Sequence, residues 1–513
     1  MLAIAASPGG SAPTGHPFRC SHDRRHPTRD EGGATLSDMA RILSTLTLLA
    51  LLSPATALAT PPPTLRVDLV HYGGRGTEGF AVERVLVEPL PWPGHPERRV
   101  DDTNLGKYRF VVTDPATGQV LYSRGSSPVY GEWETTAEAA AKTRAFGESL
   151  RFPLPESEVR VAIEKRDAAN AFRELWATTV DPTDPLIDRA APPPAGEPIV
   201  LFESGPPPVK VDLLLLGDGY TAAERGKCEA DARRLTGALF GVEPYRSRRD
   251  DFNVRALCPE ARESGISRPS LGIHRRSPAG TTYDAFGAER YVLSFDNRAW
   301  RDLAAQAPYD IVVIVVNGRT YGGGGIFGEY ATVAADSLWA PYIVVHELGH
   351  HFAALADEYY TSPAVYEPAT ERREPWEPNV TALLDPVALK WADLLTPGTP
   401  VPTPWEKEAF DARAREIQAE RQRLREARRP EEEMDALFLR QRDEEEARLG
   451  AERHAGAVGA FEGANYEATG YYRPAADCIM FTRDRVPFCP VCRRAIERVI
   501  DLYAAPLEGG SPP

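Results

Sequence analysis

His346-Glu-Leu-Gly-His350 is the stretch of sequence that decides the fold, because it places two imidazoles and a carboxylate on one short segment. The apolar residues 341–345 before it, and Phe352 and Leu355 after it, predict a buried helix. On a helix, His346 and His350 stand at positions i and i+4 and share one face. That spacing allows both imidazoles to reach one tetrahedral metal ion, normally zinc.

Glu347 lies beside the same ion, where its carboxylate can take a proton from an activated water and later deliver it to a leaving amine. A core helix whose histidines bind nothing is the alternative interpretation. A metal site is favoured because the motif falls on a buried helix with acidic residues just downstream. We therefore expect Glu347 to be the catalytic residue.

Two histidines leave one protein ligand to be found, and the next acidic residues are Asp357 and Glu358. A straight helix would carry Asp357 about 10 Å along the axis from His350, too far to share the ion. The helix must therefore bend or stop near residues 353–356, or the ligand comes from elsewhere. We expect Asp357 to be the third ligand, with Glu358 as the next choice. The alternative is an acid that supports a histidine from behind.

The bulk composition argues against two classes of partner. Of 513 residues, 42% are hydrophobic and 26% are charged, as in an ordinary folded protein of two or three domains. The formal net charge of −15 predicts no nucleic-acid partner, because such proteins carry a basic footprint. The sequence also has no long basic amphipathic stretch of the kind that binds membrane surfaces.

A targeting segment lies near the front of the chain. Residues 39–52 read as one arginine followed by an apolar run, and Ala57-Leu-Ala59 offers a cleavage site of small residues. The run is too short to span a membrane, so we expect a signal peptide and no stable membrane insertion after cleavage. Residues 1–59 form this upstream segment, whose true start is Met39 in one interpretation. The mature protein is expected to be secreted or periplasmic.

Export changes the interpretation of the cysteines, since disulfides form in oxidising compartments. Five cysteines follow the signal segment, an odd number that leaves at least one thiol unpaired within the chain. Cys489-Pro-Val-Cys492 has a spacing that suits redox chemistry or half of a metal site, but no second pair of this kind accompanies it. We expect a disulfide between Cys478 and one of these two residues. Cys228 and Cys258 offer a second bridge.

The chain divides into two domains joined by a linker. Residues 60–180 contain short period-two apolar runs separated by turns, which predict an all-β sandwich as an accessory domain. The proline-rich residues 181–209 predict a semi-rigid linker. From 210 to 513 the pattern changes to a mixed α/β domain. Its continuous apolar runs, such as 211–216 and 311–316, predict strands that are buried on both faces.

A charged insertion interrupts the second domain. Residues 405–453 are dense in Glu, Arg and Ala, with charge pairs at helical spacing and a break at Pro430. We expect a solvated helical hairpin there, since a run of charges is usually a solvated face.

Short segments between residues 210 and 495 resemble one family when they are taken in order. These segments are Gly217-Asp-Gly-Tyr-Thr221, Phe252-Asn-Val254, Tyr321-Gly-Gly-Gly324, His346-Glu-Leu-Gly-His350, Leu355-Ala-Asp-Glu-Tyr359, Tyr471-Tyr-Arg-Pro474, Cys478-Ile-Met480 and Phe488-Cys-Pro-Val-Cys492. Together they resemble the M64 metallopeptidases, the IgA peptidase group. The resemblance implies a zincin or metzincin-like catalytic fold (α+β) behind a separate β domain.

The resemblance also places Met480 in a turn beneath the zinc, on a segment that Cys478, Cys489 and Cys492 would hold near the site. Tyr466, Tyr471 and Tyr472 are the residues it suggests for binding an oxyanion. In the metzincin pattern a glycine at Ala353 would turn the chain and the third ligand would fall on Ala356. This chain departs from the pattern at both positions.

These observations predict a secreted zinc endopeptidase, with Zn²⁺ as its cofactor and a protein or peptide as its substrate. The glycine-rich residues 321–325 are expected either to form an edge strand that pairs with extended substrate or to be a flexible loop. A surface binding module with a structural zinc site is one alternative, although a structural site has no use for the base Glu347. A zinc amidase acting on peptidoglycan peptides is another.

Overall fold

The computed structural model of the chain describes residues 61–361 and 371–506. The expected signal peptide, with its cleavage site at 57–59 and the alternative start at Met39, lies outside the described residues. Within the described ranges, no helix is both long and apolar enough to cross a membrane.

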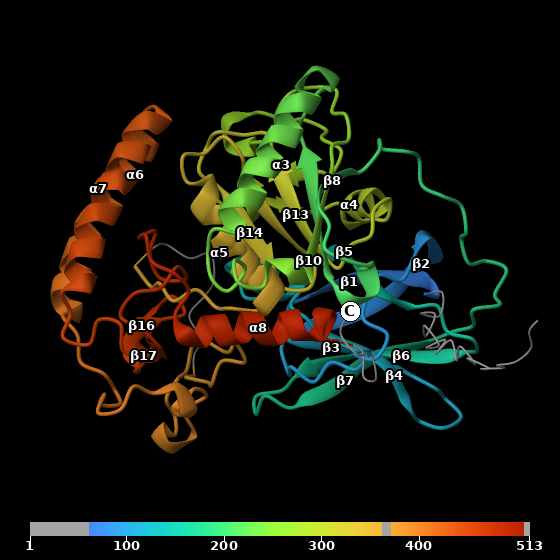
Figure 1. Cartoon of the computed structure of the whole chain (residues 1–513), viewed down its shortest axis with the longest axis horizontal. Coiled ribbons are helices and arrows are strands. Elements are labelled where there is room, and N and C mark those ends of the chain that lie inside the picture. Colours follow the sequence, from blue (N-terminus) through green and yellow to red (C-terminus); the bar gives the residue numbers. More distant parts are fainter. Residues whose placement is uncertain (1–60, 362–370, 507–513) are drawn as a thin grey trace, which may run out of the picture. The chain divides into compact units, whose positions relative to one another are not determined.

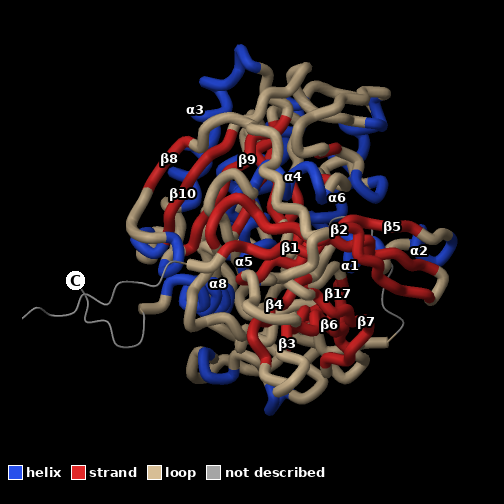
Figure 2. Tube along the Cα trace, turned by 90° about the vertical axis from the view of Figure 1, so that its right-hand side faces the viewer, coloured by secondary structure: helices blue, strands red, loops and turns tan. Residues whose placement is uncertain are grey.

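The N-terminal region consists of two antiparallel sheets with one shared apolar core (Figure 2). The strand orders are β2-β1-β5 and β4-β3-β6-β7. The strands are β1 (Pro63–Gly74), β2 (Thr77–Pro91), β3 (Tyr108–Thr113), β4 (Val120–Ser126), β5 (Arg144–Pro153), β6 (Val159–Arg166) and β7 (Phe172–Val180). Alternate residues of β1 and β6, among them Leu65, Val67, Val159 and Val161, are fully buried in that core. The residues of this apolar core recur with period two, which confirms the strands that the sequence predicts there.

Two short helices lie between β4 and β5 of the N-terminal region, and one further strand follows β7 and leads to the next region. The helices are α1 (Val129–Trp133) and α2 (Ala137–Ala141). The strand is β8 (Ile199–Phe202), which falls in the stretch expected to be linker and pairs antiparallel with β10 (Phe252–Leu257).

A six-stranded sheet forms the core of the C-terminal region, in the order β14-β15-β13-β9-β10-β8 (Figure 1). Strands β9 (Val211–Asp218), β10, β13 (Ile311–Val316) and β15 (Tyr330–Ala334) are parallel, and β8 and the edge strand β14 (Gly323–Ile326) run antiparallel to their neighbours. Every residue of β9, β10, β13 and β15 is buried. The continuous apolar runs at 211–216 and 311–316 therefore predicted β9 and β13 correctly.

Helices on both faces explain why the central strands are buried throughout. Leu213 and Leu215 of β9 share a core with three helices: α3 (Arg225–Leu239), α5 (Ala340–Ala353) and α8 (Pro490–Ala504). Leu214 and Leu216 face the opposite core, which contains α4 (Asn297–Ala304) and aromatic residues of the N-terminal region. Successive side chains on a strand point to opposite faces, so both sets must be apolar.

Two glycines of β14 allow α5 to pack directly on this edge strand. A Cβ atom on Gly323 would lie 2.5 Å from a methyl carbon of Ile343, and one on Gly325 would lie 2.4 Å from the backbone oxygen of Glu347. The glycines therefore serve the contact between helix and strand, and residues 323–326 form an edge strand rather than a flexible loop. The first residue of β14 also pairs outward with residues 290–292.

We expect Gly325→Ala to lower the free energy of unfolding by about 1–3 kcal/mol, because the added methyl group overpacks a contact between backbones. Urea unfolding followed by circular dichroism measures the change. Gly237→Ala is the matched control, since a Cβ at that position in α3 meets nothing within 4 Å and alanine favours helix. Equal effects of the two substitutions would contradict the packing role.

The charged insertion forms a hairpin of α6 (Lys407–Glu426) and α7 (Glu431–Gly450), seen at one side in Figure 1. One face of the hairpin is apolar and buried, including Phe410, Ile417, Leu437 and Phe438. The Phe438 ring packs on Tyr321 with the centroids 5.5 Å apart. The hairpin that the sequence predicts is therefore present, but it is not solvated on all sides. Its apolar face packs beside the start of β14. Two short strands follow the hairpin in the sequence, β16 (Phe461–Ala464) and β17 (Glu467–Arg473).

Candidate metal centre

Helix α5 presents His346 and His350 side by side, with their Nε2 atoms 3.2 Å apart. The Nδ1 atom of His346 lies 2.9 Å from the carbonyl oxygen of Ile479, and that of His350 lies 2.5 Å from the carbonyl oxygen of Leu355. A carbonyl only accepts a hydrogen bond, so each Nδ1 carries the proton. Both Nε2 atoms are left with a lone pair for a metal ion.

The chain turns sharply after α5 and brings Asp357 back to the two histidines. Ala354 adopts φ 54° and ψ 33°, the left-handed conformation that ends many helices. Asp357 Oδ1 then lies 3.1 Å from His346 Nε2 and 3.2 Å from His350 Nε2. The helix ends at Ala353, in the range 353–356 where the sequence predicts that it bends or stops.

The three atoms form a triangle (the ligand triangle: His346 Nε2, His350 Nε2 and Asp357 Oδ1) with sides of 3.1–3.2 Å. Tetrahedral zinc with bonds of 2.0–2.1 Å separates its ligand atoms by about 3.3 Å, so the triangle has suitable dimensions. Asp357 Oδ1 is buried and accepts no hydrogen bond from the described residues. Atoms with lone pairs that face one another repel unless a cation lies between them, and the donor set therefore fits a metal ion.

A proton can take the place of the ion in this triangle. Burial alone would lower the pKa of His350, but the carboxylate of Asp357 outweighs burial and raises the pKa to about 9. A metal ion must therefore displace a proton that His350 and Asp357 hold together.

The second carboxylate oxygen of Asp357 is held by Tyr466. The Tyr466 hydroxyl donates a hydrogen bond to Asp357 Oδ2 from the turn between β16 and β17. The backbone N–H of Tyr466 also donates to the carbonyl oxygen of Tyr359. These contacts place Tyr466 behind the ligand triangle. Tyr471, also suggested for the oxyanion, instead accepts a hydrogen bond from the Arg373 backbone.

Glu347 lies next to the histidines on the same helix and is half-buried. One oxygen of its carboxylate lies within 4.8 Å of imidazole nitrogens of His346 and His350. Burial raises the pKa of Glu347, and the two neighbouring histidines oppose that rise. The carboxylate is thus placed to exchange a proton beside the ligand triangle.

Three further residues around the triangle escaped the sequence analysis as functional candidates. The Tyr342 hydroxyl lies 3.1 Å from His346 Nδ1. The Tyr359 ring stacks near His346 at a centroid distance of 6.3 Å, and its hydroxyl accepts a hydrogen bond of 3.2 Å from Arg290. Tyr359 belongs to one of the segments that carry the resemblance, but no local signal marks Arg290.

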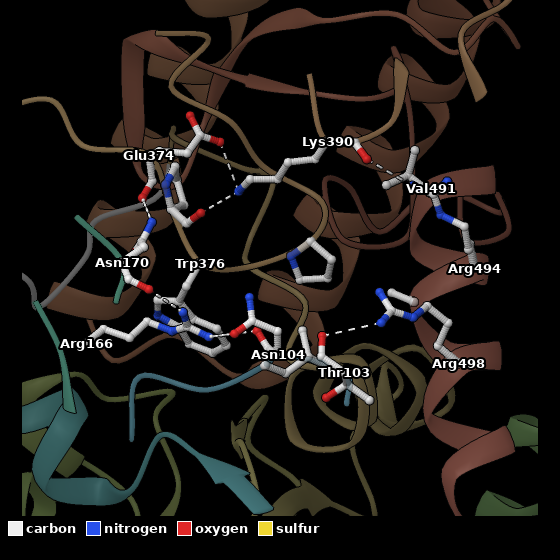
Figure 3. Close-up of a pocket in the computed structure, with 14 residues that line it drawn as sticks. Thr103, Asn104, Arg166, Asn170, Glu374, Trp376, Lys390, Val491, Arg494 and Arg498 are labelled. Atoms are coloured by element: carbon white, nitrogen blue, oxygen red, sulfur yellow. Dashed lines mark hydrogen bonds and ion pairs between the residues drawn. The ribbon is translucent and has the colours of Figure 1, made fainter. Parts of the chain in front are cut away.

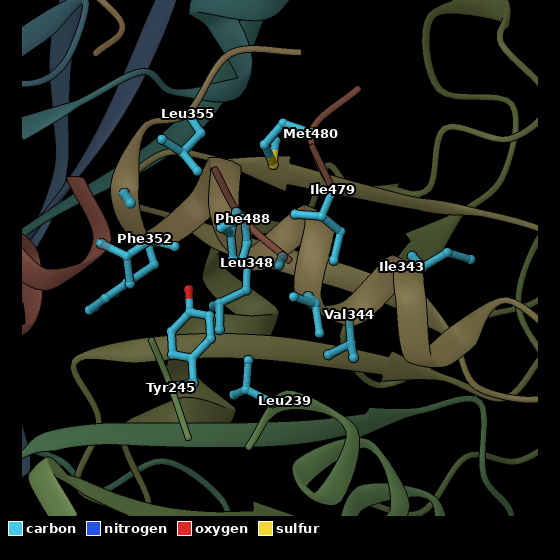
Figure 4. Close-up of a cluster of buried hydrophobic side chains, with 14 of the residues drawn as sticks. Leu239, Tyr245, Ile343, Val344, Leu348, Phe352, Leu355, Ile479, Met480 and Phe488 are labelled. Carbon is cyan, nitrogen blue, oxygen red and sulfur yellow. The ribbon is translucent and has the colours of Figure 1, made fainter. Parts of the chain in front are cut away.

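Met480 lies against Gly349, which stands between His346 and His350 in the sequence. A Cβ on Gly349 would come within 2.9 Å of Met480 Sδ and 3.3 Å of both Leu355 and Phe488 (Figure 4). Met480 is fully buried, and its carbonyl oxygen accepts a hydrogen bond from the Glu358 N–H. The segment that contains Met480 therefore packs directly under the helix that carries the motif.

The cysteines differ in part from the expectation. Cys228 and Cys258 form the disulfide that their pairing predicted. Cys478, Cys489 and Cys492 are free thiols, so the expected bridge within this group is wrong for this structure. The sulfur atoms of Cys478 and Cys492 are 3.9 Å apart, which is a contact and not a bond.

One cavity of the described region is lined by none of the residues of the ligand triangle. It has a volume of about 330 Å³ and is lined by residues of the N-terminal region, of the loop at 374–390 and of α8 (Figure 3). Its cations are already occupied, since Lys390 donates to the carbonyl oxygens of Glu377 and Val380, and Arg166 to that of Gly106.

Comparison with known families agrees with this geometry. The family described as IgA Peptidase M64 matches residues 199–500, and the family described as Peptidase M64 N-terminus matches residues 59–177. No curated protein matches the chain closely enough to count as a relative. The first match spans the six-stranded sheet, the ligand triangle and the cysteine group, so the chain belongs to the M64 peptidase family.

Proposed function

We propose that this protein is an exported, zinc-dependent endopeptidase in which Glu347 is the general base. The observation that carries the proposal is the ligand triangle, three lone-pair atoms at 3.1–3.2 Å from one another on a chain of the M64 family. A zinc ion bound there supplies Lewis acidity, which polarises the scissile carbonyl and makes a water molecule more acidic. Three protein ligands leave the fourth position open for chemistry.

In this proposal the chain's own residues move the protons. Glu347 accepts the proton that the attacking water loses and then donates it to the leaving amine. Its half-buried position and raised pKa support this role, because a general base works best with a pKa near the working pH.

Tyr359 is our proposed donor to the developing oxyanion. Its hydroxyl accepts a hydrogen bond from Arg290, which leaves its own proton free for the substrate. Arg290 adds positive charge on the same side, so the pair suits a position where negative charge develops.

The proposed catalytic fold is metzincin-like, with the turn at Met480 beneath the ligands. The close packing of Met480 on Gly349 supports this assignment. An acid at 357, rather than a residue at 356, then completes the ligands after a left-handed turn at Ala354.

Export to an oxidising compartment remains a proposal that rests on the signal-like residues 39–59. The disulfide between Cys228 and Cys258 supports it, since such bonds persist outside the cytosol. The net charge of −15 supports a protein or peptide substrate over nucleic acid.

Hydrolysis of an unstructured protein substrate by the purified chain tests the proposal. We expect activity that a zinc chelator abolishes and that added zinc restores, with internal cleavage products identified by mass spectrometry. Activity that survives removal of all metal would overturn it. Cleavage of peptidoglycan peptides, without cleavage of the protein substrate, would favour an amidase instead.

Tyr466→Phe should weaken zinc binding by about 10- to 100-fold, because the hydrogen bond behind a metal ligand orients it. Activity at saturating zinc should be largely retained. A zinc titration against a competing chelator measures the affinity. Tyr472→Phe on the same hairpin is the matched control, and an equal loss in both variants would speak against a role through Asp357.

A further inference from the structure

A second group of side chains of the types that bind metal ions includes Glu358, the residue that follows Asp357. Glu358, Cys478, Cys489 and Cys492 are all buried, and one ligand atom from each lies within 4.8 Å of the others. They come from the loop after α5, from the segment that contains Met480 and from the N-terminus of α8. We call these four side chains the cysteine group.

The contacts inside the cysteine group resemble a ligand shell more than a hydrophobic core. Cys492 Sγ lies 3.2 Å from Glu358 Oε1, and the Cys489 N–H donates to Cys478 Sγ at 3.3 Å. The 3.9 Å between Cys478 and Cys492 Sγ is close to the separation of about 3.8 Å that tetrahedral zinc with bonds of 2.3 Å imposes on two sulfurs.

The carboxylate of Glu358 lacks the partners that a buried acid needs. Oε1 accepts hydrogen bonds from Asn379 at 3.0 Å and from the Cys492 thiol at 3.2 Å, but Oε2 is buried and has no hydrogen-bond partner among the described residues. The nearby Arg473 directs its guanidinium to the carbonyl oxygens of Gly463 and Ala476. A buried carboxylate oxygen without a partner is costly, so this side chain is suited to bind a cation.

We propose that Glu358, Cys478, Cys489 and Cys492 bind a second, structural zinc ion. Four protein ligands close the tetrahedral shell, which is the arrangement of structural rather than catalytic sites. A disulfide between Cys478 and Cys492 would leave Glu358 Oε2 without a partner and would leave Cys489 outside the bridge, whereas one ion accommodates all four groups.

This ion would position the ligands of the first site. Glu358 follows Asp357 directly, and its N–H donates to the carbonyl oxygen of Met480 at 2.9 Å. The neighbouring carbonyl of Ile479 accepts the hydrogen bond from His346 Nδ1. The second ion therefore ties together the two segments that orient His346 and Asp357.

The metal content of the zinc-loaded full chain is the first measurement. We expect two equivalents per chain, and one equivalent in His350→Ala, which removes only a ligand of the triangle. One equivalent in the unaltered chain, with none in His350→Ala, would overturn the second site while leaving the proposed function intact.

Cobalt substitution identifies the ligands without depending on a variant that folds poorly. Cobalt bound by thiolates absorbs strongly in the near ultraviolet through charge transfer, whereas cobalt at two histidines and an aspartate does not. We expect this absorption in the unaltered chain and in His350→Ala, and its loss in Cys492→Ser. Absence of the band from both the unaltered chain and His350→Ala would overturn the proposal.

Thiol counting under denaturing conditions, with chelator and without reductant, separates the ion from a disulfide. The second site predicts three reactive thiols in the chain that follows the signal segment, because Cys228 and Cys258 are bridged. A single reactive thiol would mean that two of the three cysteines are bridged, and the proposed site would be excluded.

Discussion

Glu347→Gln should lower kcat/KM by about 10²- to 10⁴-fold while zinc stays bound, because glutamine keeps the shape of the side chain but cannot accept the proton. Glu347 contributes none of the three atoms that lie 3.1–3.2 Å apart, so the loss of its carboxylate leaves the ligand triangle complete. Zinc content and hydrolysis of a protein substrate are to be measured on the same preparation.

Glu432→Gln is the matched control for Glu347→Gln. Glu432 is exposed on α7 and pairs with Arg319, far from any proton transfer in the proposed mechanism. The control should keep full activity and the same zinc content. Two results for Glu347→Gln would reject the assigned role: activity near that of the control, or loss of the zinc.

Much of the fold around this residue follows from local sequence pattern. Strand β13 is apolar at every position, β9 contains four consecutive leucines, and helix α5 combines an apolar flank with two histidines at i and i+4. These signals are local because burial on both faces, or on one face of a helix, repeats within a few residues. The mixed α+β organisation behind an N-terminal β region could therefore be predicted.

The turn that brings Asp357 to the histidines depends on the backbone conformation of one residue, Ala354. No residue type in the sequence predicts that conformation. Ala354 adopts φ 54°, which is rare for residues other than glycine. The sequence therefore restricted the third ligand to two adjacent acids but gave no turn geometry to separate them. In the structure the two carboxylates diverge, with Asp357 toward the histidines and Glu358 toward the cysteines.

Contacts between segments that are distant in the sequence could not be predicted. Arg290 reaches Tyr359, and the carbonyl of Ile479 fixes the tautomer of His346, yet neither has a spacing that relates it to the motif. The odd number of cysteines was visible, but a disulfide was the natural expectation for an exported chain. Only the fold shows that Glu358 joins them.

Asp357→Ala should lower the affinity for the catalytic zinc by more than about 100-fold, since even groups behind a ligand account for about 10- to 100-fold. The substitution removes Oδ1 from the triangle and leaves the hydroxyl of Tyr466 without its acceptor. Equilibrium dialysis against a competing chelator measures the loss, and circular dichroism checks that the fold remains.

The neighbouring acid provides the contrast, because Glu358→Gln removes a carboxylate one residue away and leaves the triangle intact. At saturating zinc it should retain the ion that supports hydrolysis, and it should lose the ion proposed at the cysteine group, seen as the loss of thiolate absorption after cobalt substitution. Asp357→Ala should give the reverse, with thiolate absorption kept and hydrolysis gone. If Glu358→Gln releases the zinc needed for hydrolysis while Asp357→Ala keeps it, the two acids are assigned the wrong way round, and the 3.1 Å contact between Asp357 and His346 is an ion pair without a metal role.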